Sequence, residues 1–219
     1  MRTRSSPRPR ILPRRPRGRP KTEDLDALKA RLILAARQAF VRNGYGATSI
    51  NSIARSARVS KNTLYARFPS KAALFRAIVA RQIASVDEEL QPTSSRGEEK
   101  LEDKLRAYLN VALKESLRGD MLEINRLILA ESYQFPELGE AARARFKIGI
   151  QNVAMLIEKH ARRDQTDCRD PVTAAELLLC AGQGWYISIM ITNQAVSDGQ
   201  VTSWVDNTVN IFMASKSAW

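Results

Sequence analysis

The chain divides into segments in which apolar residues recur every three or four positions, the period of an α-helix with one buried face. This pattern predicts helices over residues 22–43, 48–57, 60–68, 70–90, 98–117, 121–133, 138–163, 172–192 and 201–214. No stretch shows the strict alternation of apolar and polar residues that is typical of a half-buried strand. We therefore predict an all-α protein.

The two shortest of these helices are framed by start and stop signals. Thr48 and Ser60 are candidate N-caps, because their hydroxyls can accept orphan N–H groups of a first helical turn. Pro69 ends the second short helix, and Ser70 caps the helix that follows. Two short helices joined by three or four residues form a helix-turn-helix, and the second has the right length for a DNA major groove.

The second short helix has an outward face without acidic residues. Its members are polar or basic: Lys61, Asn62, Thr63, Tyr65 and Arg67. A face of this kind favours contact with a phosphate-lined groove. The candidate DNA contacts also include residues that flank the short helices, namely Thr48, Ser49, Ser60 and Lys71. The alternative interpretation is a small exposed helix on a basic domain.

The positive charge is concentrated in the first part of the chain. The formal net charge is +12, and residues 1–80 contain 19 Lys and Arg against 3 Asp and Glu. Residues 81–219 are mildly acidic, with 16 Lys and Arg against 20 Asp and Glu. This distribution indicates that the N-terminal part binds double-stranded DNA and that the rest of the chain forms an ordinary helical domain. We expect a basic arm over 1–21, a DNA-binding domain over 22–80 and a second domain over 81–219.

The first 21 residues contain nine Lys and Arg, five Pro and no acidic residue. We expect this arm to lack a folded core of its own. Its end, with Arg17, Arg19 and Lys21 around Gly18 and Pro20, is similar to the centre of an AT-hook. Arginines in such a segment can enter a narrow A·T minor groove. The alternative is a polybasic tail that only adds charge.

The segment from Val172 to Thr192 is apolar on almost every side. One side can be buried within its own domain, and the other then needs a partner. Small Ala181 and Gly182 would allow close approach of a second copy, so the segment predicts a homodimer. The alternative is the central helix of a monomeric bundle.

The sequence shows no catalytic or metal-binding pattern. His160 is the only histidine, and we expect it at the surface or beside the C-terminus of its helix. Two cysteines, Cys168 and Cys180, are too few for a disulfide framework, and Cys180 is expected to be buried because it lies in an apolar run. No uninterrupted apolar run reaches the length of a membrane span. We therefore expect a cytoplasmic protein that acts on the chromosome, with no cofactor, no enzymatic activity and no membrane partner.

The segments LILAARQAFVRNGYGATSINSIA and VSKNTLYARFPSKAALFRAIV resemble the DNA-binding domain of TetR-type transcriptional regulators. Arg58 occupies the position at which the turn of that family usually has glycine, so a strained backbone is expected there. Asn62, Arg67 and Ala72 also depart from the family pattern, which changes the expected operator rather than the fold. The segment LILAESYQFPELGEAARARF resembles the C-terminal domain of AefR-like members.

The resemblance implies a C-terminal pocket for a small molecule and a dimer formed by the last two helices. The candidate pocket residues are aromatic, polar or thioether side chains: Tyr108, Asn125, Met155, Gln183, Trp185 and Tyr186. Such residues at helical spacing are also common in a plain core. The resulting hypothesis is a homodimeric repressor that a small-molecule ligand releases from a palindromic operator. The alternative is an architectural protein, insensitive to ligands, that bridges A·T-rich DNA.

Overall fold

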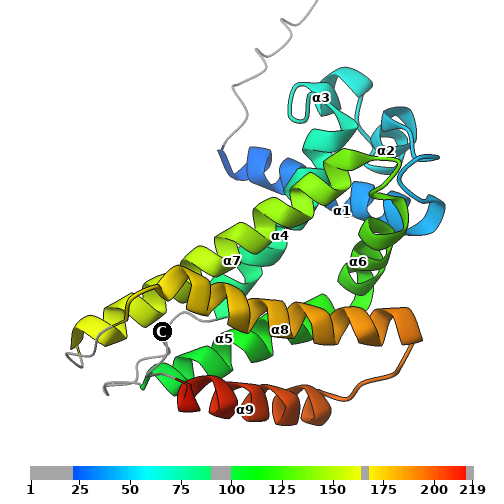
Figure 1. Ribbon diagram of the computed structural model, residues 1–219. Coiled ribbons are helices and arrows are strands. Elements are labelled where there is room, and N and C mark those ends of the chain that lie inside the picture. Colours follow the sequence, from blue (N-terminus) through cyan, green and yellow to red (C-terminus); the bar gives the residue numbers. More distant parts are fainter. Residues whose placement is uncertain (1–21, 90–99, 164–167, 216–219) are drawn as a thin grey trace, which may run out of the picture.

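The computed structural model describes residues 22–89, 100–163 and 168–215, and all regular structure in these ranges is helical (Figure 1). The all-α prediction is confirmed. The helices are α1 Thr22–Asn43, α2 Ile50–Ser56, α3 Lys61–Tyr65, α4 Lys71–Glu89, α5 Leu101–Ser116, α6 Gly119–Glu131, α7 Pro136–Arg163, α8 Pro171–Thr192 and α9 Asp198–Ala214.

The short helices α2 and α3 lie with α1 at one end of the molecule, and α5, α8 and α9 form the other end (Figure 1). The long helices α4 and α7 pack against each other and connect the two ends. Helix α6 packs on α1, and α7 also packs along α8. Helices α6 and α7 therefore contact elements from both ends of the molecule.

Two hydrophobic cores stabilise the molecule. The first contains Phe40, Tyr45 and Phe75, and it also takes in Ile124 from α6 and Leu138 from α7. The second joins α5, α7, α8 and α9 through residues such as Leu105, Val153, Leu178 and Val205. The first core thus includes residues from both sides of the expected domain boundary at residue 80.

The helix ends follow the predicted capping chemistry with two corrections. Ser60 caps α3 and Ser70 accepts the N–H of Ala73 at 3.0 Å, as predicted. The predicted cap of α2 by Thr48 is wrong, because Ser49 accepts the N–H of Ser52 at 3.1 Å. Pro136 begins α7 instead of lying in the preceding turn, which suits a residue without an N–H at the first helical position.

His160 lies in the last turn of α7, which was one of its two predicted positions, although it is only 3% exposed and its Nδ1 lies 2.8 Å from the Leu156 carbonyl oxygen. The predictions for Cys180 and Gly182 are wrong. Cys180 is exposed, whereas Gly182 is buried. A Cβ at Gly182 would lie 3.7 Å from Leu113 Cδ2, so this glycine faces α5 of its own chain rather than a second copy.

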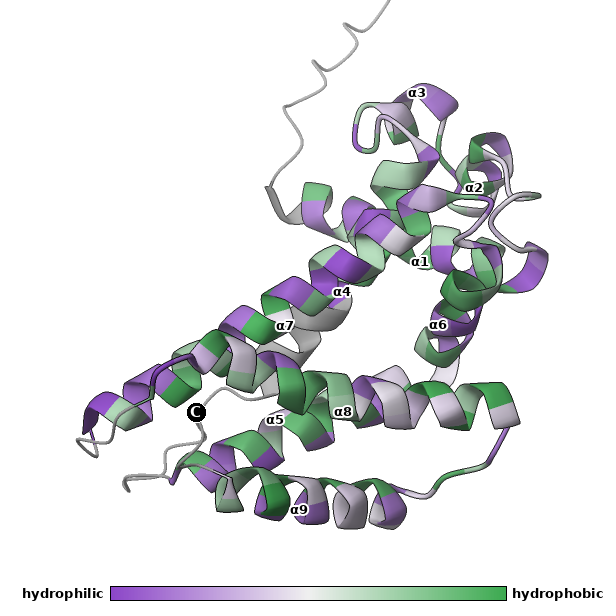
Figure 2. Cartoon of the chain, viewed as in Figure 1, coloured by the Kyte–Doolittle hydropathy of each residue, from purple (hydrophilic) through white to green (hydrophobic). Residues whose placement is uncertain are grey.

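Helix α8 carries hydrophobic residues along most of its length (Figure 2). Among the described residues it is the one helix long and apolar enough to cross a membrane. It packs instead against α5, α7 and α9 of this chain. Leu177 and Ile191 remain exposed on its outer side, at 65% and 73%.

The turn between α2 and α3 provides a test of backbone strain. Arg58 has φ +52°, the left-handed conformation that costs a side-chain-bearing residue roughly 1–2 kcal/mol. Arg58→Gly removes this cost and adds about 0.4–1 kcal/mol of unfolded-state freedom. We expect a net stabilisation of roughly 0.5–1 kcal/mol in urea unfolding. Arg55→Gly, inside α2, is the control and should destabilise by up to about 1 kcal/mol. Equal destabilisation by both variants would contradict strain at Arg58.

Candidate nucleic-acid interface and cavity

Helices α2 and α3 form the predicted helix-turn-helix. Four residues separate them, and the Val59 N–H donates to the Ala54 carbonyl at 3.0 Å across the turn. Ala54 and Ala57 are buried, so α3 can cross α2 closely. The positive φ of Arg58 closes the turn where a glycine would adopt this conformation without strain.

The outward side of α3 is polar and exposed. Leu64 is fully buried and anchors the helix, while the Ser60 Oγ accepts the N–H of Thr63 at 3.0 Å. Tyr65 is 40% exposed, and the Lys61 Nζ lies 5.6 Å from the centre of its ring. Asn62 and Arg67 are exposed as well, and Thr63 is partly buried. The face offers several hydrogen-bond donors and no carboxylate.

The other predicted DNA contacts have different positions. Ser49 and Ser60 lie at the N-termini of α2 and α3, where their hydroxyls act as caps. Thr48 is 3% exposed, and its hydroxyl donates to the Gly44 carbonyl at 2.7 Å. Its side chain is therefore directed into the protein and away from a groove. Arg17, Arg19 and Lys21 lie outside the described residues.

Lys71 also has an internal role instead of a free surface position. Its Nζ donates to the carbonyls of Tyr45 at 2.8 Å and Thr48 at 3.1 Å, and it lies 4.3 Å from the centre of the Tyr45 ring. Burial lowers the pKa of Lys71, and the nearby Glu137 and Glu131 oppose this shift. The ammonium of Lys71 thus holds the segment that precedes α2.

That segment, residues 44–48, is called the Tyr45 turn. On its other side, the two carboxylate oxygens of Glu131 accept the N–H groups of Tyr45 at 3.1 Å and Gly46 at 3.0 Å. The Tyr45 hydroxyl donates to Glu137 Oε1 at 2.8 Å. Burial, followed by this hydrogen bond and the Glu137 charge, raises the pKa of Tyr45. The Tyr45 turn is therefore hydrogen-bonded both to the end of α6, through Glu131, and to the first turn of α7, through Glu137.

Aromatic packing completes this attachment. The ring centres of Tyr45 and Phe135 lie 5.2 Å apart in an edge-to-face arrangement. A Cβ at Gly46 would approach Phe135 Cζ to 3.0 Å, so the close contact depends on the absence of a side chain there. Sequence reasoning missed Glu131, Phe135 and Glu137, because they lie more than 80 residues from the turn. Their only signal was membership in the segment that resembles AefR-like proteins.

A cavity lies among α5, α7 and α8. Its volume is about 110 Å³, and it opens to solvent. The walls are mainly apolar or aromatic, and three of the six predicted residues contribute to them: Tyr108, Gln183 and Tyr186. Gly149 lets Tyr108 come close to α7, since a Cβ there would lie 3.3 Å from the Tyr108 hydroxyl oxygen.

The other three predicted pocket residues do not line this cavity. Met155 is 60% exposed. Trp185 stacks on Trp204 of α9 with ring centres 4.7 Å apart. Asn125 lies behind the wall, 2% exposed, and accepts a hydrogen bond from Arg145 Nη1 at 3.1 Å. Arg145, which does line the cavity, was absent from the sequence prediction.

Comparison with known proteins supports both parts of this arrangement. The model of bacterial regulatory proteins of the tetR family matches residues 32–78, and that of the C-terminal domain of AefR-like transcriptional repressors matches residues 99–215. The HTH-type transcriptional repressor ComR of Escherichia coli K12 is 29% identical over 180 residues, which cover 78% of this chain and 82% of that one.

Solved structures agree in fold. A TetR-family regulator from Mesorhizobium loti MAFF303099 has a TM-score of 0.69 and 27% identity, covering 86% of this chain and 96% of its own. The flavonoid-responsive regulator FrrA has a TM-score of 0.67 and 27% identity, covering 87% and 97%. The likeness therefore extends over the helix-turn-helix and the cavity-bearing end together.

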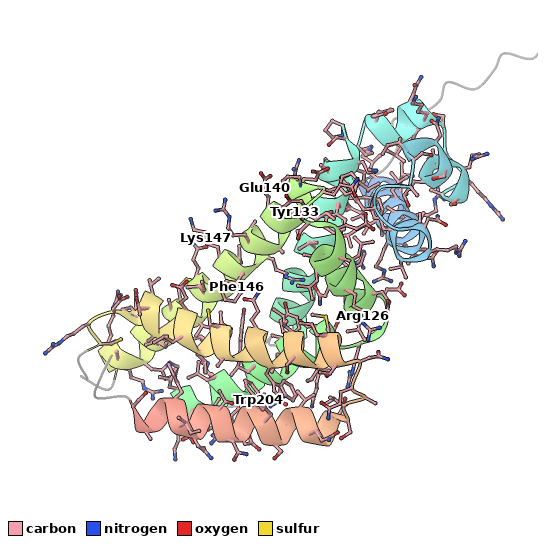
Figure 3. The ribbon with its side chains drawn as sticks, turned by 45° about the vertical axis from the view of Figure 1, so that its right-hand side comes forward. Arg126, Tyr133, Glu140, Phe146, Lys147 and Trp204 are labelled. Carbon is pink, nitrogen blue, oxygen red and sulfur yellow. The ribbon has the colours of Figure 1, made fainter. Side chains whose placement is uncertain are left out.

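The attachment of the Tyr45 turn can be tested through stability. Glu131→Ala leaves two backbone N–H groups without their acceptor, and hydrogen bonds to charged groups contribute roughly 1.5–3 kcal/mol. We expect the free energy of unfolding to fall by about 1–3 kcal/mol in urea titration. Glu140→Ala, at an exposed position of α7 marked in Figure 3, is the matched control and should have little effect. Equal losses in the two variants would argue against the attachment.

Proposed function

Because this chain belongs to the TetR family of bacterial regulatory proteins, we propose that it is a homodimeric repressor that leaves its operator when a small molecule fills the cavity. Proteins of this family are DNA-binding transcription factors and not enzymes. One observation carries the proposal. Helices α6 and α7 hold the Tyr45 turn through Glu131 and Glu137, and the same two helices carry Asn125 and Arg145 beside the cavity.

The repressor would read DNA with α3. Lys61, Asn62, Thr63 and Tyr65 would face base edges in the major groove, because Lys61, Asn62 and Tyr65 are exposed and Thr63 is partly exposed. Arg67 and the N-terminal ends of α2 and α3 would contact phosphates. All of this would take place in the cytoplasm, on chromosomal DNA.

The dimer would form through α8 and α9. These two helices expose Leu177 at 65%, Ile191 at 73% and Ile211 at 74%. Exposed apolar side chains that gather in a patch are typical of a protein–protein interface. A groove between α8 and α9 is lined by Leu177, Ala181 and Ile211 among others. Ala181 and Gly184 are exposed and small, which suits close approach of helices from a second copy.

Release of the repressor from its operator would follow from a change in the spacing of the two recognition helices. A dimer places two recognition helices about 34–36 Å apart to match successive major grooves. A ligand that shifts α6 or α7 would move the Tyr45 turn and with it α2 and α3, so the spacing would no longer match. FrrA is named as a flavonoid-responsive regulator, and this supports a small-molecule effector here too.

The sequencing of DNA selected by the purified protein tests this proposal. A regulator should select an inverted repeat protected over less than roughly 20 base pairs with high sequence specificity. Long, sequence-tolerant coverage of A·T-rich DNA would instead favour an architectural protein. The basic arm makes this second function worth testing, since residues 1–21 carry nine positive charges.

The recognition helix gives the first functional prediction. Lys61→Ala and Tyr65→Ala should each weaken operator binding by about 1–3 kcal/mol, the range for loss of a base contact, with unchanged helical circular dichroism. Lys147→Ala removes the same charge from the exposed side of α7 and is the control (Figure 3). If both α3 variants bind as tightly as the control, α3 is not the recognition helix.

The dimer gives a second prediction. Leu177→Arg places a charge on the exposed apolar side of α8, where it would lose hydration on association. We expect sedimentation to show monomers that fail to bind a full operator. Tyr133→Arg, at a fully exposed position, should remain dimeric (Figure 3). A dimeric Leu177→Arg protein would place the interface elsewhere.

The arm gives a third prediction. We propose that Arg17 and Arg19 enter the minor groove beside the operator. Replacing both by lysine keeps the charge but loses the flat, weakly hydrated guanidinium. Measured on operators with A·T or G·C flanks at two salt concentrations, the variant should keep its non-specific affinity and lose its preference for A·T flanks. A wild-type protein without any flank preference would reduce the arm to a charged tail.

A further inference from the structure

The size of the cavity among α5, α7 and α8 limits what it can hold. Its volume is about 110 Å³. An engineered apolar cavity of about 150 Å³ in another protein holds one benzene molecule, so this space accepts a single ring of carbon atoms at most. Much of its wall is apolar, with Leu109 and Leu113 from α5, Phe146 from α7 (Figure 3) and Leu179 from α8. Size and walls together favour a small ring over a larger or strongly hydrated molecule.

Gly182 keeps part of this space open. It lies inside α8 without a positive φ, at a position where alanine would be the better helix former. A Cβ at Gly182 would lie 3.7 Å from Leu113 Cδ2 and 3.9 Å from Leu109 Cδ2, which are ordinary contact distances. Neither the backbone conformation nor close packing therefore requires a glycine here. An added methyl group would instead reduce the volume of the cavity, because Gly182 belongs to its wall.

The wall also carries one polar side chain that has no hydrogen bond to the residues the structure describes, that of Gln183. The other polar residues of the wall are engaged. Arg145 is hydrogen-bonded to Asn125 and to Tyr186, the Ser116 hydroxyl donates to a carbonyl of its own helix at 2.7 Å, and Tyr108 has a partner as well. The carboxamide of Gln183 can therefore both donate to and accept from a molecule in the cavity.

We propose that the effector of this cavity is a neutral molecule with one aromatic ring and one hydroxyl group, and that the hydroxyl binds the amide of Gln183. This rests on the proposed function, in which a small molecule occupies the cavity. A hydroxyl donates and accepts, as the carboxamide does, and a neutral group loses less hydration than a charged one between apolar walls. The aromatic side chains of Phe146 and Tyr186 suit a flat ring, which aromatic groups contact in edge-to-face or offset arrangements.

Titration calorimetry of matched ligands with the full-length protein tests the proposal. The probes are benzyl alcohol, toluene, which lacks the hydroxyl, and naphthalenemethanol, which carries the hydroxyl on two fused rings. Benzyl alcohol should bind the wild-type protein, and roughly tenfold or more tightly than the two-ring alcohol, because a second ring exceeds the volume of the cavity. A lack of binding by benzyl alcohol, or equal binding by the two-ring alcohol, would overturn the proposal.

Gln183→Leu identifies the residue that binds the hydroxyl. Leucine is similar in size to glutamine but has no amide, so toluene should bind this variant as well as it binds the wild type. Benzyl alcohol should bind the variant roughly tenfold more weakly, because its hydroxyl would be buried without a partner. Toluene binding thus also reports whether the variant folds. An unchanged affinity of benzyl alcohol in this variant would contradict the assignment to Gln183.

Gly182→Ala tests the role of the open space. It should weaken binding of benzyl alcohol and toluene alike, and it should raise the urea midpoint of unfolding, because alanine favours the helix and fills the cavity. Gly139→Ala, in α7 and outside the cavity wall, is the control, since a Cβ there would lie 3.7 Å from Ser132 Cβ. It should leave both affinities unchanged. A Gly182→Ala protein with wild-type affinities would show that this glycine does not make room for the ligand.

The proposed function is judged separately by operator binding without any ligand. Specific operator binding by a protein that does not bind benzyl alcohol would overturn only the effector class. A protein that selects no specific DNA would overturn the proposed function, whatever the probes do.

Discussion

The structure depends most on the pair of hydrogen bonds that the Glu131 carboxylate accepts from the Tyr45 turn. Successive N–H groups of a turn have no partner in regular structure, and a carboxylate is a strong acceptor for both. Lys71 satisfies carbonyls on the opposite side of the same turn, so the two charges complement each other through the backbone. The segment that starts α2 is thereby fixed by groups from α4 and from the joint between α6 and α7.

Under the proposed function, this attachment would let a cavity distant from α3 influence DNA binding. Asn125 and Glu131 lie on the same helix, about 9 Å apart at 1.5 Å per residue, and Glu137 and Arg145 on α7 are separated by about 12 Å. Helices transmit a displacement over such distances without bending much. Ligand contact with Arg145 would therefore act on both carboxylates that hold the Tyr45 turn.

Local chemistry made much of the fold predictable, whereas non-local contacts did not. Caps such as Ser60 and the strained Arg58 follow from their immediate neighbours in the sequence. Helix α8 was predicted, but its sequence is apolar on every side. Such a pattern does not show which side of the helix faces which neighbour, so Gly182 was assigned to the wrong face. The contacts of Glu131 and Arg145 join segments far apart in the chain, and no spacing rule relates such segments. The sequence therefore predicted three residues of the cavity wall, Tyr108, Gln183 and Tyr186, and missed the charged residue Arg145.

The distance between the two α2 helices of the proposed dimer is the measurement that shows whether Glu131 fixes the Tyr45 turn. A spin label at exposed Ser56, introduced as Ser56→Cys with Cys168→Ser and Cys180→Ser, gives one distance between protomers by pulsed electron resonance. With Glu131 intact we expect a narrow distance distribution, and Glu131→Ala should broaden or shift it while Glu140→Ala leaves it unchanged. A Glu131→Ala dimer with the wild-type distance and width would show that the Tyr45 turn does not set the position of the DNA-binding helices.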